Sequence, residues 1–233
     1  MNNRLIIATI KSWNIENAKK LKKQLIDFDI DIISDKKYLS FDYINKINPR
    51  YIFLPHWSWI IPKNIYKNFE CVVFHITDLP YGRGGSPLQN LIINKQYETK
   101  ISALKVSKDV DAGTIYYKIP FSVKNGSANE ILQKASDIIF FKMITYILEK
   151  KPTPVEQKGD IVIFKRRKSE ESDMQRAQIY NLNDFYNFIR MLDGEGYPNA
   201  FIKLHKHKIL FSKVINNKSN ELIGKFKIIK DDE

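Results

Sequence analysis

The first third of the chain alternates short apolar runs with longer amphipathic segments. The runs have the length of buried strands, and we predict strands at residues 4–10, 29–34, 51–54 and 71–75. After the first run, apolar residues recur at three- and four-residue spacing, which is typical of a surface helix: Ile15, Ala18, Leu21, Leu25 and Phe28. Helical connections are expected between the later strands as well.

Strands that are separated by helices require right-handed crossovers and a largely parallel sheet. We therefore predict an α/β fold, an open, mostly parallel, twisted sheet with helices on both faces. Such sheets bind their ligands beyond the carboxyl ends of the strands. His75 and the loop after it lie at such an end, so this loop is the first place to look for function.

A long helix is predicted in the second half of the chain. Ser127 and Glu130 have the spacing of a capping box, and apolar residues continue at helical spacing as far as Lys150. Pro152 and Pro154 follow and end the helix.

The remainder of the chain predicts a smaller, β-rich part. We expect a short strand at 160–164, a short helix at 184–192 and alternating strands from 201 to 230. The predicted organisation is a domain of residues 1–165 and a helix- and β-rich C-terminal subdomain of residues 166–233.

Composition adds a charge preference. The 233 residues carry a formal net charge of +12, which favours phosphates, nucleic acids or anionic membrane surfaces as partners. Lysine-rich composition with solvated side chains is the simpler explanation. The basic segment Arg166–Lys168 is balanced by the acidic residues that follow it, so we expect no nucleic-acid interface there.

Several classes of site are excluded by what the sequence lacks. Cys71 is the only cysteine, which excludes an intrachain disulfide and a cysteine-rich zinc site and favours a reducing cytoplasm. His205 and His207 have no cysteine or acidic partner at metal-ligand spacing, so we predict no metal. The first strand is followed by Lys11–Asn14 rather than a glycine-rich dinucleotide-binding loop.

Targeting segments are not expected either. The amino-terminal apolar run is too short for a signal peptide, and no segment approaches the roughly 18 apolar residues that a membrane helix needs. We expect a soluble, unprocessed, cytoplasmic protein that does not bind membranes.

Two segments of the chain carry a combined pattern. The residues of the first are His75, Leu79, Pro80, Arg83, Gly84, Pro87 and Gln89, and those of the second are Thr99, Ile101, Ser102, Asp111 and Gly113. This pattern resembles the formyltetrahydrofolate-dependent formyltransferases, in which a strand ends in histidine and is followed by a Leu-Pro loop, Arg-Gly, Pro and often Gln, and a later segment ends in Asp-Thr-Gly.

Further elements resemble the sugar N-formyltransferase branch of this family. Trp59–Pro62 is similar to the segment that lines the pterin site, and the branch's Arg-Arg, Ile-Arg and Tyr-Pro-Gly-Ala-Phe elements are similar to Arg166–Lys168, Phe188–Arg190 and Tyr197–Phe201. The loop after His75 looks most like formyltransferases of pseudaminic acid biosynthesis. The resemblance covers roughly residues 1–205, and its combined spacing is specific although each piece alone is weak.

The resemblance implies a Rossmann-like catalytic domain over residues 1–165, formyltetrahydrofolate as co-substrate, a nucleotide-linked deoxyamino sugar (UDP- or dTDP-linked) as acceptor, and a homodimer. It also implies the site residues. His75, Asp111 and His56 are the catalytic candidates. The folate-binding candidates are Trp59, Ile60, Ile61, Pro62, Val106 and Asp111, and the substrate-binding candidates are Thr77, Tyr81 and Arg83.

The chemistry agrees with this choice of residues. Transfer of a formyl group to an amine passes through a tetrahedral oxyanion, so the site must stabilise negative charge and accept a proton. A protonated histidine beside a carboxylate can do both. We expect His75 to face the oxyanion and Asp111 to accept the amine proton, directly or through water.

One departure from the family pattern concerns the oxyanion. The family carries an asparagine two positions before the histidine, and Val73 stands there in this chain. Loss of one oxyanion donor commonly lowers the rate by about 10²- to 10³-fold. His56, directly after the third strand, is our candidate substitute, and Asn90 is a weaker one.

Other interpretations remain open. His75 could be a structural residue at a strand end, and Arg83 could brace its loop instead of binding a substrate phosphate. Methionyl-tRNA is an alternative acceptor that agrees with the basic charge. With Val73 in place of asparagine, the chain could also be a folate- or nucleotide-sugar-binding protein that has lost turnover.

Overall fold

The computed structural model describes residues 2–218 and 220–231. The chain divides into two compact units, which are described separately. The first comprises Met1–Gly84, Thr99–Phe121 and Gln133–Ile163, and the second comprises Gly85–Glu98, Ser122–Leu132 and Phe164–Glu233. The second unit is therefore not one continuous segment of the chain, and the division expected at residue 165 stays a prediction.

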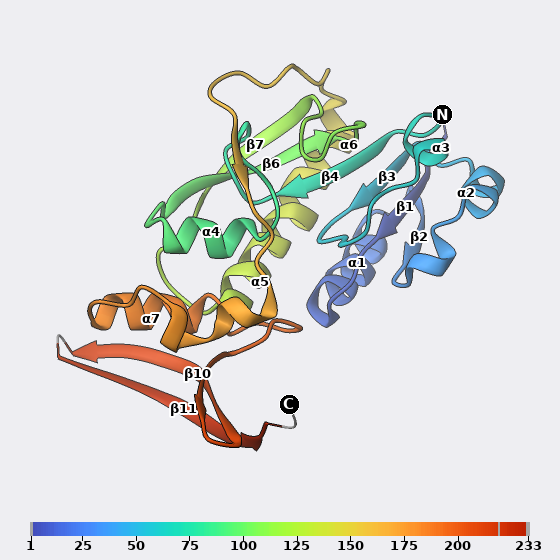
Figure 1. The fold of residues 1–233 in the computed structure, drawn as a ribbon. Helices are drawn as coiled ribbons and strands as arrows, with labels where there is room; N and C mark the ends of the chain where they lie inside the picture. The colour runs from blue at the N-terminus through green and yellow to red at the C-terminus, as the bar shows by residue number, and fades with distance from the viewer. Residues whose placement is uncertain (1, 219, 232–233) are drawn as a thin grey trace. The chain divides into compact units, whose positions relative to one another are not determined.

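The first unit is built on a six-stranded sheet with the order β2-β1-β3-β4-β6-β7 (Figure 1). Strands β1 to β4 pair with one another in parallel, and β6 runs antiparallel to β4. The strands are β1 (Arg4–Ala8), β2 (Asp29–Ile33), β3 (Tyr51–Leu54), β4 (Cys71–His75), β6 (Glu98–Lys105) and β7 (Ile115–Ser122). The predicted open, mostly parallel α/β sheet is confirmed, while β6 and β7 were not among the predicted strands.

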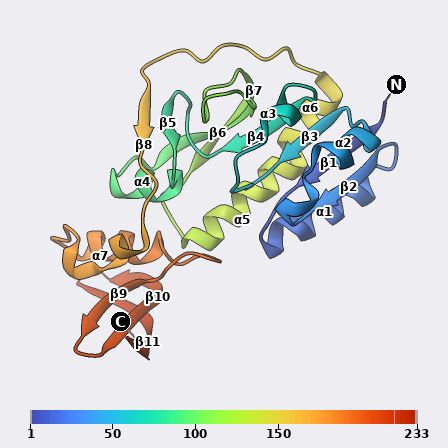
Figure 2. The ribbon, with the colours of Figure 1, turned by 45° about the vertical axis from the view of Figure 1, so that its right-hand side comes forward.

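Helices cover this sheet on both faces, as predicted. On one face, Ile6 and Ile52 of the strands share a core cluster with Ile44 and Ile65, which belong to two short helices. Strand residues next to these in sequence, such as Phe53, point to the opposite face and are equally buried. The helices of this unit are α1 (Ser12–Gln24), α2 (Phe41–Ile47), α3 (Lys63–Tyr66), the later part of α5 (Ala128–Ile138), a π-helical segment (Ile139–Ile144) and α6 (Thr145–Lys150) (Figure 2).

The buried face of α1 differs from the predicted apolar stripe. Asn14 and Asn17 are buried together with Ala18 and Leu21, whereas Ile15 is only half-buried. The two asparagines are accommodated by hydrogen bonds. Asn14 Oδ1 accepts from Ser136 Oγ at 2.6 Å, and Asn17 Nδ2 donates to Ser136 Oγ at 2.9 Å. A polar contact with α5 therefore sets the rotation of α1.

The second unit contains α4 (Pro87–Ile93), α7 (Leu182–Arg190) and a three-stranded antiparallel sheet. The strands of this sheet are β9 (Ala200–Leu204), β10 (His207–Lys218) and β11 (Glu221–Lys230), which confirms the predicted β-rich tail. Arg190 is 1% exposed, and its guanidinium donates to the carbonyls of Val123 and Gly126 at 3.0 and 2.9 Å. This buried arginine ties α7 to the chain segment before α5.

The capping box at the start of the long helix forms as predicted. Ser127 N–H donates to Glu130 Oε2 at 2.8 Å, and Glu130 N–H donates to Ser127 Oγ at 3.3 Å. Among the described residues, none of the helices combines the length and the apolar character needed to span a membrane.

Candidate active site

The candidate site lies where β4 ends. His75 is the last residue of β4 and is 7% exposed. The chain then passes through a Leu79–Pro80 peptide bond in the cis form into β5 (Tyr81–Gly84), which pairs with β8 (Val162–Phe164). The parallel strands of an α/β sheet present their functional residues at this end.

His75 contacts two different groups through its two ring nitrogens. Nε2 lies 2.7 Å from the carbonyl oxygen of Gly82, and Nδ1 lies 3.5 Å from Asp111 Oδ2. A carbonyl can only accept, so the Nε2 atom carries a proton and donates it to Gly82. The structure therefore brings together His75 and Asp111, the two residues that the sequence analysis paired.

Asp111 lies in the turn between β6 and β7 and adopts a left-handed backbone conformation, with φ of 54°. Its Oδ2 atom accepts a hydrogen bond from Gly84 N–H at 3.0 Å. Gly113 ends the same turn, and a Cβ atom there would lie 1.7 Å from the carbonyl oxygen of Lys105. Only glycine can therefore occupy the last position of the turn that carries Asp111.

The contacts of the His75–Asp111 pair constrain its protons. With Nε2–H directed at Gly82, a neutral imidazole would present the lone pair of Nδ1 to the carboxylate, and two acceptors repel each other. The side chains of His75 and Asp111 are only 9% and 15% exposed, so the pair lies in a largely water-excluded place.

His56 follows β3 with φ of 50°, and its ring contacts Trp13 edge-on with ring centroids 5.0 Å apart. Both ring nitrogens are buried and have no hydrogen-bond partner within the described residues. Burial, with a smaller effect of Lys11, lowers the pKa of His56 to about 4, so the ring is neutral near pH 7. Within that same part of the chain, no hydrogen bond or ion pair links His56 with His75 or Asp111.

The candidate folate-binding residues separate into two groups. Ile61 is 7% exposed, and Val106 packs against the core cluster to which Ile61 belongs. Trp59 and Ile60, by contrast, are 39% and 89% exposed, and Pro62 is also exposed. The structure therefore brings Ile61 and Val106 together and leaves the other three at the surface.

The candidate substrate-binding residues are held by the loop itself. Thr77 is fully buried, and its hydroxyl donates to the Gly82 carbonyl at 3.4 Å. Tyr81 is half-buried and begins β5. Arg83 is half-buried and donates from Nε and Nη2 to Gln157 Oε1, at 3.0 and 2.7 Å.

Val73 and Asn90 bear on the question of the oxyanion. Val73 packs against two core clusters, so an apolar contact replaces the amide that the family resemblance leads one to expect. The side-chain amide of Asn90 donates to the carbonyls of Gly85, Ser86 and Lys165 and is already engaged.

Sequence reasoning missed three participants in the site. Gly82 contributes its carbonyl and Gly84 its N–H, and both are backbone groups that side-chain patterns do not reveal. Gln157 donates to the carbonyls of Asp111 and Gly113 from a segment without regular secondary structure. An ordinary glutamine in such a segment carries no pattern that could have identified it.

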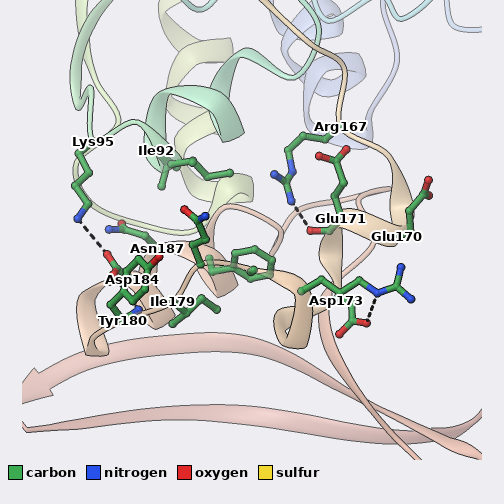
Figure 3. Close-up of a pocket in the computed structure, with 15 residues that line it drawn as sticks. Ile92, Lys95, Arg167, Glu170, Glu171, Asp173, Ile179, Tyr180, Asp184 and Asn187 are labelled. Atoms are coloured by element: carbon green, nitrogen blue, oxygen red, sulfur yellow. Dashed lines mark hydrogen bonds and ion pairs between the residues drawn. The ribbon is translucent and has the colours of Figure 1, made fainter.

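The second unit has a pocket of its own, with a volume of about 550 Å³ (Figure 3). It is lined by residues of α4, α7 and the segment between β8 and α7, and none of the predicted site residues is among them. Its charged groups face one another: Lys95 pairs with Asp184 at 3.2 Å, and Arg176 pairs with Asp173 at 3.4 Å. These two ion pairs neutralise four of the charged side chains that line the pocket.

Comparison with known proteins gives consistent results. Residues 169–229 match the family model described as the methionyl-tRNA formyltransferase C-terminal domain. A solved structure of the methionyl-tRNA formyltransferase from Clostridium thermocellum is 50% identical, with a TM-score of 0.94, and the match covers 97% of this chain and 99% of that one.

Two further similarities are more distant. The methionyl-tRNA formyltransferase of Campylobacter jejuni (strain 81-176) is 25% identical over 161 residues, which are 69% of this chain and 52% of the relative. The chain thus spans about half the length of such curated relatives. HypX of Aquifex aeolicus, solved in complex with tetrahydrofolic acid, shares the fold with a TM-score of 0.73 at 15% identity, over 94% of this chain and 40% of that one.

Proposed function

We propose, from the premise that this chain belongs to the formyltransferase family, that it transfers a formyl group from formyltetrahydrofolate to a primary amine. Support for the folate comes from the relatives: the family is one of formyltransferases, and a protein with the same fold has been solved with tetrahydrofolic acid. The assignment of the site rests on the residues themselves.

The observation that carries this proposal is the approach of Asp111 Oδ2 to His75 Nδ1 at 3.5 Å, at the carboxyl end of β4. The two residues lie far apart in the sequence, yet they share a largely buried place. The distance is longer than a direct hydrogen bond, but catalytic contacts commonly tighten once substrate is bound.

The chemistry needs an acceptor for a proton and a group that stabilises negative charge. The amine nitrogen attacks the formyl carbon, and the carbonyl oxygen becomes an oxyanion. The amine's proton passes to Asp111. The oxyanion then collapses to a carbonyl, the bond between the formyl carbon and the folate nitrogen breaks, and Asp111 gives the proton to that nitrogen. The Nε2–H of His75 stabilises the oxyanion. The oxyanion takes the place of the Gly82 carbonyl as the acceptor of this N–H, because a charged acceptor forms the stronger hydrogen bond.

Methionyl-tRNA is the acceptor that the relatives favour. The protein that is 50% identical over nearly the whole chain carries that activity in its name, as does the Campylobacter jejuni relative. The formal net charge of +12 agrees with a polyanionic substrate. The sequence interpretation placed a nucleotide-linked amino sugar first, and these similarities favour its alternative.

A nucleotide-linked 4-amino sugar remains the second candidate acceptor. The segment Tyr197–Phe201 and the basic segment Arg166–Lys168 resemble elements of the sugar N-formyltransferase branch. In the amino-sugar case the enzyme would act in glycan or lipopolysaccharide biosynthesis, in the cytoplasm and as a homodimer.

The test is a formylation assay with both acceptors. The purified chain is incubated with formyltetrahydrofolate and either charged initiator methionyl-tRNA or a UDP- or dTDP-linked 4-amino sugar, and mass spectrometry records the gain of one formyl group. A product with the tRNA supports the first acceptor, and a product with the sugar alone supports the second. Folate binding by calorimetry without product from either acceptor would contradict the proposed activity and favour a binding protein.

A further inference from the structure

Gln157 lies in the irregular segment between α6 and β8, and this segment is attached on both sides to elements of the candidate site. Val155, two residues before it, forms an antiparallel bridge with Ile115 at the start of β7, with N–H to O distances of 2.7 and 2.9 Å. Val162 N–H donates to the Pro80 carbonyl at 3.4 Å, in the loop after His75. The path of the backbone is thus fixed on either side of Gln157.

The amide of Gln157 makes four hydrogen bonds. Its Nε2 donates to the carbonyls of Asp111 and Gly113, both at 2.8 Å. Its Oε1 accepts from Nε and Nη2 of Arg83, at 3.0 and 2.7 Å. The opposite orientation of the amide would direct its NH₂ at the guanidinium and its oxygen at two carbonyls, so only one orientation is compatible with these neighbours.

These four bonds connect both parts of the site that orient the carboxylate of Asp111. The two donated bonds hold the carbonyls on either side of Ala112, in a turn whose Asp111 has φ of 54°, a conformation that persists only where the surroundings enforce it. The two accepted bonds hold Arg83, and the next residue, Gly84, donates its N–H to Asp111 Oδ2.

We infer that Gln157 is a positioning residue for Asp111, one that keeps its carboxylate within reach of His75. This inference rests on the proposed formyl transfer. Arg83 then acts as a partner of Gln157, and its guanidinium braces the site from the strand β5.

Gln157→Glu separates the two functions of the amide. A carboxylate still accepts from Arg83 but cannot donate to the carbonyls of Asp111 and Gly113. We expect kcat for formyl transfer to fall by about 10- to 100-fold, because small misplacements of catalytic groups have effects of this size, while KM for both substrates changes by less than about threefold. The matched control is Tyr116→Phe, which removes a side-chain hydrogen bond to Glu70 in the same unit and should leave kcat unchanged.

A second measurement reports on the site without any turnover. The chain contains only four histidines, so ¹⁵N-histidine NMR can resolve His75. We expect its Nδ1 resonance to shift in Gln157→Glu and not in Tyr116→Phe. If Gln157→Glu fails to fold, Gln157→Met, which keeps the side-chain length without the amide, replaces it in both measurements.

The inference is overturned if a folded Gln157 variant keeps the kcat and the His75 resonance of the wild type, or if it changes KM alone. Absence of transfer by the wild-type protein with either acceptor would instead contradict the proposed function. In that case the His75 resonance alone decides whether Gln157 positions Asp111.

Discussion

Two of the candidate site residues, Asp111 and His56, are among the non-glycine residues of the first unit that adopt left-handed backbone conformations. Asp111 has φ of 54° and His56 has φ of 50°. Such conformations cost on the order of 1–3 kcal/mol and persist only where the surrounding structure enforces them. For Asp111 the enforcing contacts are those of Gln157 and Gly84, so the strain coincides with the residue that we place in the reaction.

His56 makes the stability of the protein depend on pH. Burial lowers its pKa to about 4 from the ordinary 6.5, so the unfolded ring binds a proton in this range and the folded ring does not. Stability therefore falls as the pH is lowered through this window. Between about pH 7 and about pH 5 the loss from this residue should be about 2 kcal/mol.

The variant His56→Asn isolates this contribution, because asparagine tolerates a positive φ and does not titrate. Urea unfolding at the two pH values should show a smaller loss of stability in the variant than in the wild type. Equal losses in both proteins would show that His56 is not the titrating group.

At the level of elements, the polar contact between α1 and α5 is a specific source of stability. Asn17 Nδ2 donates to Ser136 Oγ and to Asp137 Oδ1, at 2.9 and 2.8 Å. Replacing Asn17 with alanine leaves the buried hydroxyl of Ser136 without this donor, which should lower the free energy of unfolding by about 1–3 kcal/mol. Lys19→Ala removes an exposed ion pair with Glu16 from the same helix and should leave the free energy of unfolding nearly unchanged, because solvent screens exposed ion pairs.

Urea denaturation midpoints of the two variants and the wild type check this expectation. A midpoint for Asn17→Ala equal to that of Lys19→Ala would mean that the polar contact contributes nothing.

The elements that were predicted correctly are those whose burial is visible locally. The strands β1 to β4 are buried, and such strands appear in the sequence as apolar runs. The strand β6 was missed because polar residues interrupt it: Lys100 pairs with Asp78 and Lys105 with Glu70. The buried face of α1 was misassigned for a related reason, since Asn17 is satisfied by a partner 119 positions away.

The candidate site was predictable in part, again for physical reasons. His75 and Asp111 have ionisable side chains at recognisable places in the chain, and the structure brings these side chains to within 3.5 Å of each other. The hydrogen bonds that Gln157 donates depend on backbone carbonyls and on the path of an irregular segment, and no local sequence pattern indicates either of these. The surroundings of His56 were not predictable from a local pattern either. Its ring lies against Trp13, and in the described part of the chain no hydrogen bond or ion pair joins it to His75 or Asp111.

At the scale of the whole molecule, the formal net charge of +12 bears on the choice of acceptor. Binding of a nucleic acid releases counterions and weakens steeply with salt. Raising the salt from about 50 to about 200 mM should therefore increase KM for methionyl-tRNA by at least about tenfold. KM for formyltetrahydrofolate should change by less than about threefold, because it carries few charges. Steady-state kinetics at the two salt concentrations measure both KM values, and a KM for tRNA that is insensitive to salt would contradict a role of the net positive charge in binding.

The central claim is that the carboxylate of Asp111, beside His75, serves formyl transfer, and Asp111→Asn tests it most directly. Asparagine tolerates the backbone conformation and can still accept from Gly84 N–H, but it cannot take up the amine proton. Single-turnover transfer from formyltetrahydrofolate, followed by mass spectrometry, should be at least about 100-fold slower than in the wild type, with the melting temperature unchanged. A folded Asp111→Asn protein that transfers the formyl group at the wild-type rate would contradict the account.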